Sequence, residues 1–279
     1  ILNFLRSECV KKGQLTPHYH YVSRPPFTEA EAVRRAIYLA GQTDTPLYIA
    51  HMTCREAIAE LQKAKGTGQR VSGETCTHYL TTTKEVLDNP DFNEAAKFVC
   101  SPALRDREDC EALWQALSDG LLTAVSSDHC GIDVAELKQA GRNDFTQIPN
   151  GSPGAGDRLH MVWTEGVCTG KLTRQKFVDV IATQPAKING IYPRKGTLAV
   201  GSDADVVIFD PNYEGTVHLA DNPNGVDYNL YEGRRQSGRV ETVLLRGQVV
   251  VENAKFVGRY GQGKFIPANM YASGYENRN

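Results

Sequence analysis

The sequence lacks the features that mark several large classes of protein. None of its apolar runs approaches the roughly 18 residues of a membrane-spanning helix, and it shows no signal-peptide pattern, so we expect neither membrane insertion nor export. Lysine plus arginine number 31 and aspartate plus glutamate 33, a net charge of −2. This balance argues against a nucleic-acid partner and against binding to an anionic membrane surface.

Motifs for nucleotide binding and serine hydrolysis are also missing. The sequence contains no G-x-G-x-x-G or Walker A stretch and no G-x-S-x-G nucleophile elbow. Its seven cysteines are an odd number and form no CxxC pair. In a chain of 279 residues this usage favours reduced thiols and a cytoplasmic location over a disulfide framework.

The most informative stretch that is present is LTAVSSDHCG, residues 122–131. Its apolar start, Thr123 to Val125, has no polar alternation, which is typical of a strand buried on both faces in a parallel sheet. Catalytic groups in such sheets lie where strands end, and Asp128 stands at that place. We interpret Asp128 as a metal ligand that also transfers protons; the alternative is a cap for the following turn.

Four histidines are candidate metal ligands by position or pattern. His51 ends the short apolar strand 46–51, where a neutral imidazole is a common zinc ligand, although a hydrogen-bonded core histidine would look the same. His78 follows the strand 70–76 and competes with His51 on spacing alone. His18 and His20 form an HxH pair, but we expect it in a polar loop spanning residues 14–27 with no supporting strand, so we do not predict a metal site there.

Strands and helices alternate through the first two-thirds of the chain. Thr28 and Glu31 predict a capping box at the start of a helix, and further helices are expected near residues 54–65 and 106–119. This pattern fits a (β/α)8 barrel, but three or four strands cannot close one. From about residue 193 the segments 205–210 and 241–251 become β-rich, with a hairpin turn expected at 246–248.

Several motifs resemble those of the dihydropyrimidinase and D-hydantoinase branch of the cyclic amidohydrolases. GSDADVVIFD is shared by many amidohydrolases, whereas SSDHC together with IPNG-x-PG and DYN-x-YEG is more specific to this branch. The remaining matching segments are PLYIAHMT, GETCTHYL and VCSPALR. They occur in the family's order along nearly the whole chain.

The resemblance implies a fold and a set of roles. It implies the C-terminal part of a (β/α)8 TIM-like barrel in residues 1–192 and the C-terminal portion of a small β-sandwich, with a terminal arm, in residues 193–279. His51 corresponds to a zinc-binding histidine at the end of the sixth barrel strand. Asp128 corresponds to the metal-binding general base and acid that ends the eighth strand. Ser101 and Asn150 correspond to residues whose backbone groups hold the substrate ring, and His78 falls outside the metal site.

Much of the family's metal centre does not match any part of this sequence. The resemblance implies two zinc ions bridged by a carboxylated lysine, an HxH pair on the first strand, a further histidine ligand and a substrate-facing tyrosine, all preceding Ile1. We therefore expect an N-terminally truncated chain that is inactive by itself.

The activity implied is zinc-dependent hydrolysis of a small cyclic amide, a dihydropyrimidine or 5-substituted hydantoin, to an N-carbamoyl amino acid by a cytoplasmic homotetramer. The alternatives are an allantoinase or dihydroorotase, or a non-catalytic relative such as the collapsin response mediator proteins, which act by interaction.

Overall fold

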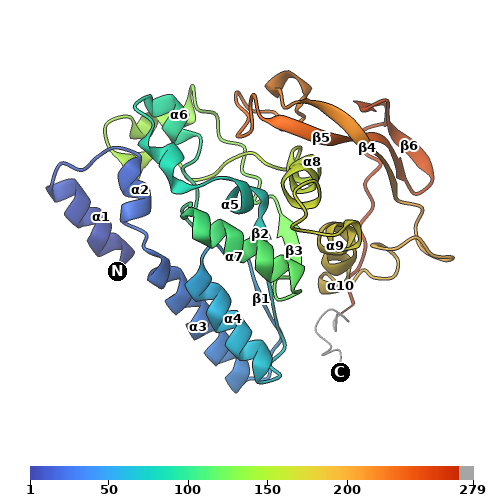
Figure 1. The fold of residues 1–279 in the computed structure, drawn as a ribbon, viewed down its shortest axis with the longest axis horizontal. Coiled ribbons are helices and arrows are strands. Elements are labelled where there is room, and N and C mark those ends of the chain that lie inside the picture. Colours follow the sequence, from blue (N-terminus) through green and yellow to red (C-terminus); the bar gives the residue numbers. More distant parts are fainter. Residues whose placement is uncertain (270–279) are drawn as a thin grey trace. The chain divides into compact units, whose positions relative to one another are not determined.

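The structure is a computed structural model that describes residues 1–269, and these residues form two compact units (Figure 1). The first unit comprises Ile1–Arg158 and Val217–Arg234. The second begins at Leu159, runs to Thr216 and resumes at Arg235. Among the residues described, no helix is both long and apolar enough to cross a membrane.

The first unit is built on a parallel sheet in which β2 is the central strand. The strands are β1 (Leu47–Ile49), β2 (Val71–Cys76) and β3 (Ala124–Ser126), in the order β1-β2-β3. Ile49 lies opposite Gly73, and Cys76 lies opposite Ser126. The predicted strands that lead to His51 and Asp128 are therefore both present, and they end at the same edge of the sheet because all three run in one direction.

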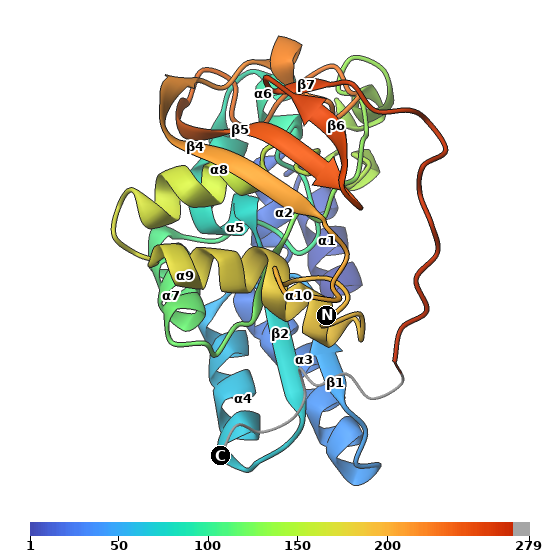
Figure 2. The same ribbon diagram turned by 90° about the vertical axis from the view of Figure 1, so that its right-hand side faces the viewer.

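Three helices of the first unit follow one another across its sheet (Figures 1 and 2): α3 (Pro26–Gln42), α4 (Arg55–Gly66) and α7 (Arg107–Ser118). Their buried side chains recur at helical spacing; on α4 they are Ala57, Ile58, Leu61 and Ala64. The side chain of Asp106 caps α7 by accepting a hydrogen bond from the Asp109 amide at 3.1 Å.

The predicted capping box at Thr28 is wrong, because α3 begins two residues earlier. Pro26 occupies the first turn, where its fixed φ suits a helix and its missing N–H is not needed. The Thr28 hydroxyl instead donates to the Pro25 carbonyl at 2.8 Å. Glu31 lies within the helix and pairs with Arg35 at 3.5 Å.

Short helices and turns complete the first unit. They are α1 (Leu2–Lys11), α2 (His18–Val22), α5 (Thr77–Thr81), α6 (Phe92–Ala96) and the 3₁₀ turns Lys84–Asp88, Leu137–Gly141, Phe145–Gln147 and Leu219–Asp221. The expected loop at residues 14–27 thus contains a helix. An apolar cluster underlies this region, formed by Cys9, Leu87, Ala96, Val99, Phe145 and Ile148.

Within the first unit, the side chains of two aspartates hold residues 217–234 against the earlier part of the chain. The buried Asp157 carboxylate accepts hydrogen bonds from three asparagine amide groups, at 2.6 Å from Asn222, 3.2 Å from Asn224 and 3.1 Å from Asn229. The Asp227 carboxylate accepts from the backbone amides of residues 134 and 135 at 2.9 and 2.8 Å. The DYN-x-YEG motif therefore anchors this segment of the chain.

The second unit contains helices and an antiparallel sheet. Its helices are α8 (Arg158–Val162, the first residue belonging to the other unit), α9 (Arg174–Val178) and α10 (Gln184–Ile188), with π-helical turns at Trp163–Val167 and Asp179–Thr183. The sheet has the order β4-β5-β6-β7, with β4 (Val206–Thr216), β5 (Arg235–Leu245), β6 (Gln248–Glu252) and β7 (Lys255–Phe256).

Aromatic rings join helix and sheet in the second unit, and a tight turn joins two of its strands. The ring centroid of Trp163 lies 5.3 Å from that of Phe177 and 4.9 Å from that of Phe209. Arg246 and Gly247 have φ values of 49° and 78°, which suit a two-residue hairpin loop and confirm the expected turn. The proposed boundary at residue 193 lies between α10 and β4 and stays a prediction.

We expect Asp157→Ala to destabilise the protein by about 2–4 kcal/mol, because one buried and two partly buried amide groups lose their charged acceptor. The denaturant midpoint of unfolding would measure this. Asp221→Ala, at an exposed aspartate of the same returning segment, is the matched control and should shift the midpoint little. Equal midpoints for the two variants would show that the carboxylate does not anchor the segment.

Candidate metal and substrate site

His51 and Asp128 occupy matching positions at the carboxyl edge of the sheet. Each lies two residues beyond the end of its strand, β1 for His51 and β3 for Asp128, on either side of β2. Both have left-handed backbones, with φ of 40° at His51 and 46° at Asp128. Only a few per cent of non-glycine residues adopt this conformation, although aspartate and histidine adopt it more often than most, and strained residues of this kind cluster at functional sites.

The donor set at these two positions fits a divalent metal ion. The imidazole of His51 is half-buried and the carboxylate of Asp128 is exposed, and neither makes a hydrogen bond to another residue in the described part of the chain. Imidazole nitrogen and carboxylate oxygen are among the ligands of catalytic zinc sites, which use three protein side chains. Within residues 1–269 no group of three or more histidine, cysteine, aspartate or glutamate side chains is placed to hold a metal ion.

The segment after Asp128 is bonded to the segment that carries Asn150. His129 and Ser152 form a parallel bridge, and the Cys130 amide donates to the Ser152 carbonyl at 3.0 Å. Gly151 permits this close approach: its φ is +144°, and a Cβ there would lie 2.7 Å from the Cys130 side chain. Asn150 is thereby held beside the loop that follows β3.

Ser101 lies against the same segment. Its hydroxyl donates to the side-chain oxygen of Asn150 at 3.2 Å, and the Gly151 amide donates to the Val99 carbonyl at 3.0 Å. Ser101 and Asn150 are both exposed. The structure thus brings together the two residues expected at the substrate ring, and it connects them through residues 150–152 to the loop of Asp128.

A buried ion pair supports the turn that follows His51. The Glu29 carboxylate accepts from the Thr53 amide at 2.7 Å and pairs with Arg105 at 3.1 Å, and Arg105 Nε donates to the Thr53 hydroxyl at 2.9 Å. The side chains of Glu29 and Arg105 are only 9% and 4% exposed. This network joins Thr53, the last residue of PLYIAHMT, to Arg105, the last residue of VCSPALR.

His78 is buried at the start of α5. Burial, and then the charge of nearby His51, lower the pKa of His78 to about 3, so its ring is neutral at physiological pH. Its Nε2 atom has no hydrogen-bond partner in the described chain. The ring stacks at a tilt on Tyr79, with centroids 4.0 Å apart.

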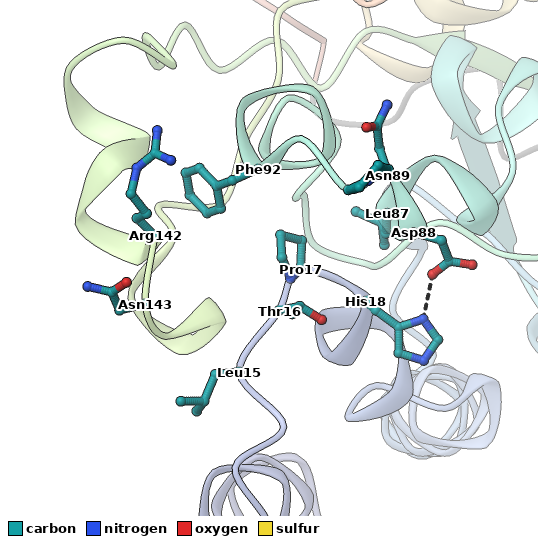
Figure 3. Close-up of a pocket in the computed structure, with 11 residues that line it drawn as sticks. Leu15, Thr16, Pro17, His18, Leu87, Asp88, Asn89, Phe92, Arg142 and Asn143 are labelled. Carbon is teal, nitrogen blue, oxygen red and sulfur yellow. Dashed lines mark hydrogen bonds and ion pairs between the residues drawn. The ribbon is translucent and has the colours of Figure 1, made fainter.

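The two histidines of the HxH pair have different partners. His18 Nδ1 lies 2.5 Å from an Asp88 carboxylate oxygen, at the rim of a pocket of about 520 Å³ that Phe92 and Arg142 also line (Figure 3). His20 is buried and its Nε2 lies 2.8 Å from the Cys100 carbonyl oxygen. The pair therefore does not converge on one point.

Comparisons with known proteins identify the family of this chain. Residues 30–250 match the model of the Amidohydrolase family. The D-hydantoinase of Ralstonia pickettii is 47% identical over 269 residues, which are 96% of this chain and 58% of that protein. The dihydropyrimidinase of Arabidopsis thaliana is 39% identical over 261 residues, 94% of this chain and 49% of that protein.

Solved structures give the same result. A D-hydantoinase structure superposes with a TM-score of 0.95 at 46% identity, over 97% of this chain and 59% of the other. The dihydropyrimidinase from Brevibacillus agri gives a TM-score of 0.95 at 42% identity, over 100% of this chain and 59% of the other.

The chain belongs to the amidohydrolase family, whose members are metal-dependent. It spans about 58% of the length of the D-hydantoinase relatives that it matches. The predicted fold, the C-terminal part of a TIM-like barrel with part of a β-sheet domain, is confirmed by the solved neighbours, as is the resemblance to hydantoinases and dihydropyrimidinases.

We expect Arg105→Ala to lower the free energy of unfolding by about 3–5 kcal/mol, because it leaves the Glu29 carboxylate buried without a partner. The exposed pair of Glu31 and Arg35 on the same helix provides the control, since Arg35→Ala should cost less than about 0.5 kcal/mol. Denaturant unfolding of both variants tests this. Similar losses in the two would mean that the Glu29 pair is solvated.

Proposed function

We propose that the protein containing these residues hydrolyses cyclic amides, opening a dihydropyrimidine or a 5-substituted hydantoin to an N-carbamoyl amino acid. The observation that carries the proposal is the placement of His51 and Asp128 just beyond the ends of the two strands that flank β2. Both residues have left-handed backbones, and within residues 1–269 neither side chain has a hydrogen-bond partner. Relatives named D-hydantoinase and dihydropyrimidinase support this class of substrate.

His51 and Asp128 would hold the metal. Within the proposal the cofactor is a pair of zinc ions, with the remaining ligands, among them a carboxylated lysine, coming from outside these 279 residues. A divalent ion, when bound, polarises a carbonyl and lowers the pKa of water to about 7.

Asp128 would also move the proton. Its carboxylate is exposed at the edge of the sheet, where it can accept a proton from the attacking water and return it to the leaving ring nitrogen. The backbone groups of Ser101 and Asn150 would hold the two amide edges of the ring, which fixes the carbonyl for attack. The contact between these two residues supports a single substrate position.

The proposal extends to location and assembly. A cytoplasmic location is supported by the free state of all seven cysteines, five of which are buried. A homotetramer would cover apolar side chains that are exposed in this chain, including Phe4 on α1 and Tyr38 and Leu39 on α3. Sedimentation of the purified protein would measure the subunit number.

We expect Asp128→Asn to lower kcat/KM by about 10³-fold, because the amide cannot accept the proton and binds metal poorly. Hydrolysis of dihydrouracil and a 5-substituted hydantoin, followed together with metal content, tests this in the protein that contains the chain. Asp119→Asn, at the exposed end of α7, is the control and should keep activity.

The same assay separates the alternatives. Hydrolysis of allantoin or dihydroorotate in preference to the other two rings would replace the proposed substrate. A protein that binds no metal and hydrolyses none of the four would be a non-catalytic interaction protein. Substantial activity in Asp128→Asn would remove the role assigned to this carboxylate.

A further inference from the structure

Lys138 is a fully buried lysine whose ammonium group is surrounded by backbone carbonyls. It lies in the turn Leu137–Gly141 with an exposed fraction of 0%. Its Nζ donates to the carbonyl oxygens of Ala96, Val99 and Gly151 at 2.8, 3.2 and 2.7 Å. The described chain supplies no carboxylate that pairs with it, so three carbonyls use all three of its protons.

These carbonyls belong to the two segments that carry the proposed substrate residues. Val99 precedes Ser101 by two residues, and Gly151 directly follows Asn150. The Val99 carbonyl accepts from the Gly151 amide as well as from Lys138. One ammonium group therefore joins the segments at residues 96–101 and 150–151, which lie about fifty positions apart in the sequence.

His20 holds the first of these segments from another side. Burial, and then the charge of Arg24, lower the pKa of His20 to about 3, so its ring is neutral and Nε2 donates to the Cys100 carbonyl at 2.8 Å. The Tyr79 hydroxyl donates to the Pro102 carbonyl at 2.7 Å. Each carbonyl on either side of Ser101 thus has a donor from a distant part of the chain.

We propose that Lys138 and His20 are positioning residues that set the spacing between the backbone at Ser101 and the backbone at Asn150, and so select a ring whose two amide edges match that spacing. This rests on the proposed function, because it assumes that the ring is held at those two residues. Lys138 and His20 act through the backbone that they hold and do not touch the substrate.

The energetics favour such a role. Burying a lysine ammonium group removes its hydration, which is unfavourable for any buried ion, and here burial lowers the pKa of Lys138 to about 8. A methionine would fill much the same volume without that cost. A cationic amine, unlike methionine, supplies three hydrogen-bond donors on one atom. These donors hold carbonyls of residues 96–101 and 150–151 at about 3 Å from Lys138 Nζ, and so fix the two segments relative to each other.

Lys138→Met in the protein that contains this chain tests the proposal. We expect hydrogen exchange to rise about tenfold in peptides covering 98–104 and 148–154, since hydrogen bonds to a charged group are lost, while the rest of the first unit keeps its protection. We expect KM for hydantoin or dihydrouracil to rise about 10- to 100-fold, with a smaller change in kcat and unchanged metal content. Lys63→Met, at an exposed lysine on α4, is the control.

Two variants at His20 test the support of the backbone near Ser101. They test the proposal even if Lys138→Met does not fold. His20→Leu removes the donor to Cys100 and should raise both KM and exchange at 98–104. His20→Gln keeps a donor at a similar reach and should restore most of both. Rescue by glutamine would not follow from a role in packing alone.

Unchanged exchange in either segment of a folded Lys138→Met protein would overturn the proposal, and so would unchanged KM once both segments exchange faster. Equal effects of leucine and glutamine at position 20 would also overturn it for His20. If the unaltered protein hydrolyses no cyclic amide, the proposed function fails separately, and the exchange data still decide whether Lys138 joins the two segments.

Discussion

The parallel pairing of β1, β2 and β3 is the constraint on which the site depends. Because the three strands run in one direction, the residues that follow them emerge at one edge, and a histidine from one outer strand and an aspartate from the other flank β2. Antiparallel pairing would send one of these residues to the opposite edge. The left-handed backbones at both residues then turn the chain sharply as soon as it leaves the strand.

Around this edge the backbone is held mainly by side chains from remote parts of the sequence. The turn after His51 is bonded to Glu29, and the backbone near Ser101 is bonded to His20 and Lys138. These supports are buried, and each contacts backbone groups of the segment it holds. Their common effect is to order short connections that have no regular hydrogen bonding of their own.

The sequence was sufficient to predict the elements whose signal is local. The strands before His51 and Asp128, the helix after residue 106 and the hairpin turn at Arg246 follow from periodicity, capping and turn residues, and the structure has them all. The start of α3 was missed because Pro26 can begin a helix without a side-chain cap. The helix at residues 18–22 was missed because its five residues are too few to show a period.

The supporting residues could not be predicted in the same way. A lysine in the sequence normally indicates a solvent-exposed position. Lys138 is buried because the backbone carbonyls of residues 96, 99 and 151 accept its hydrogen bonds. The sequence gives no signal for the bond of His20 to the Cys100 carbonyl, because the two residues are 80 positions apart. The roles of His51, Asp128, Ser101 and Asn150 stay predictions that the geometry accommodates.

The return of residues 217–234 to the first unit has a topological consequence. The polypeptide passes from one unit to the other after residues 158, 216 and 234, so each unit is assembled from separated stretches of the chain. A single cut in the backbone would release neither unit intact, and the ribosome completes the first unit only after it has made all of β4, a strand of the second. The order of the segments along the chain therefore prevents the first unit from being completed before the second has begun to form.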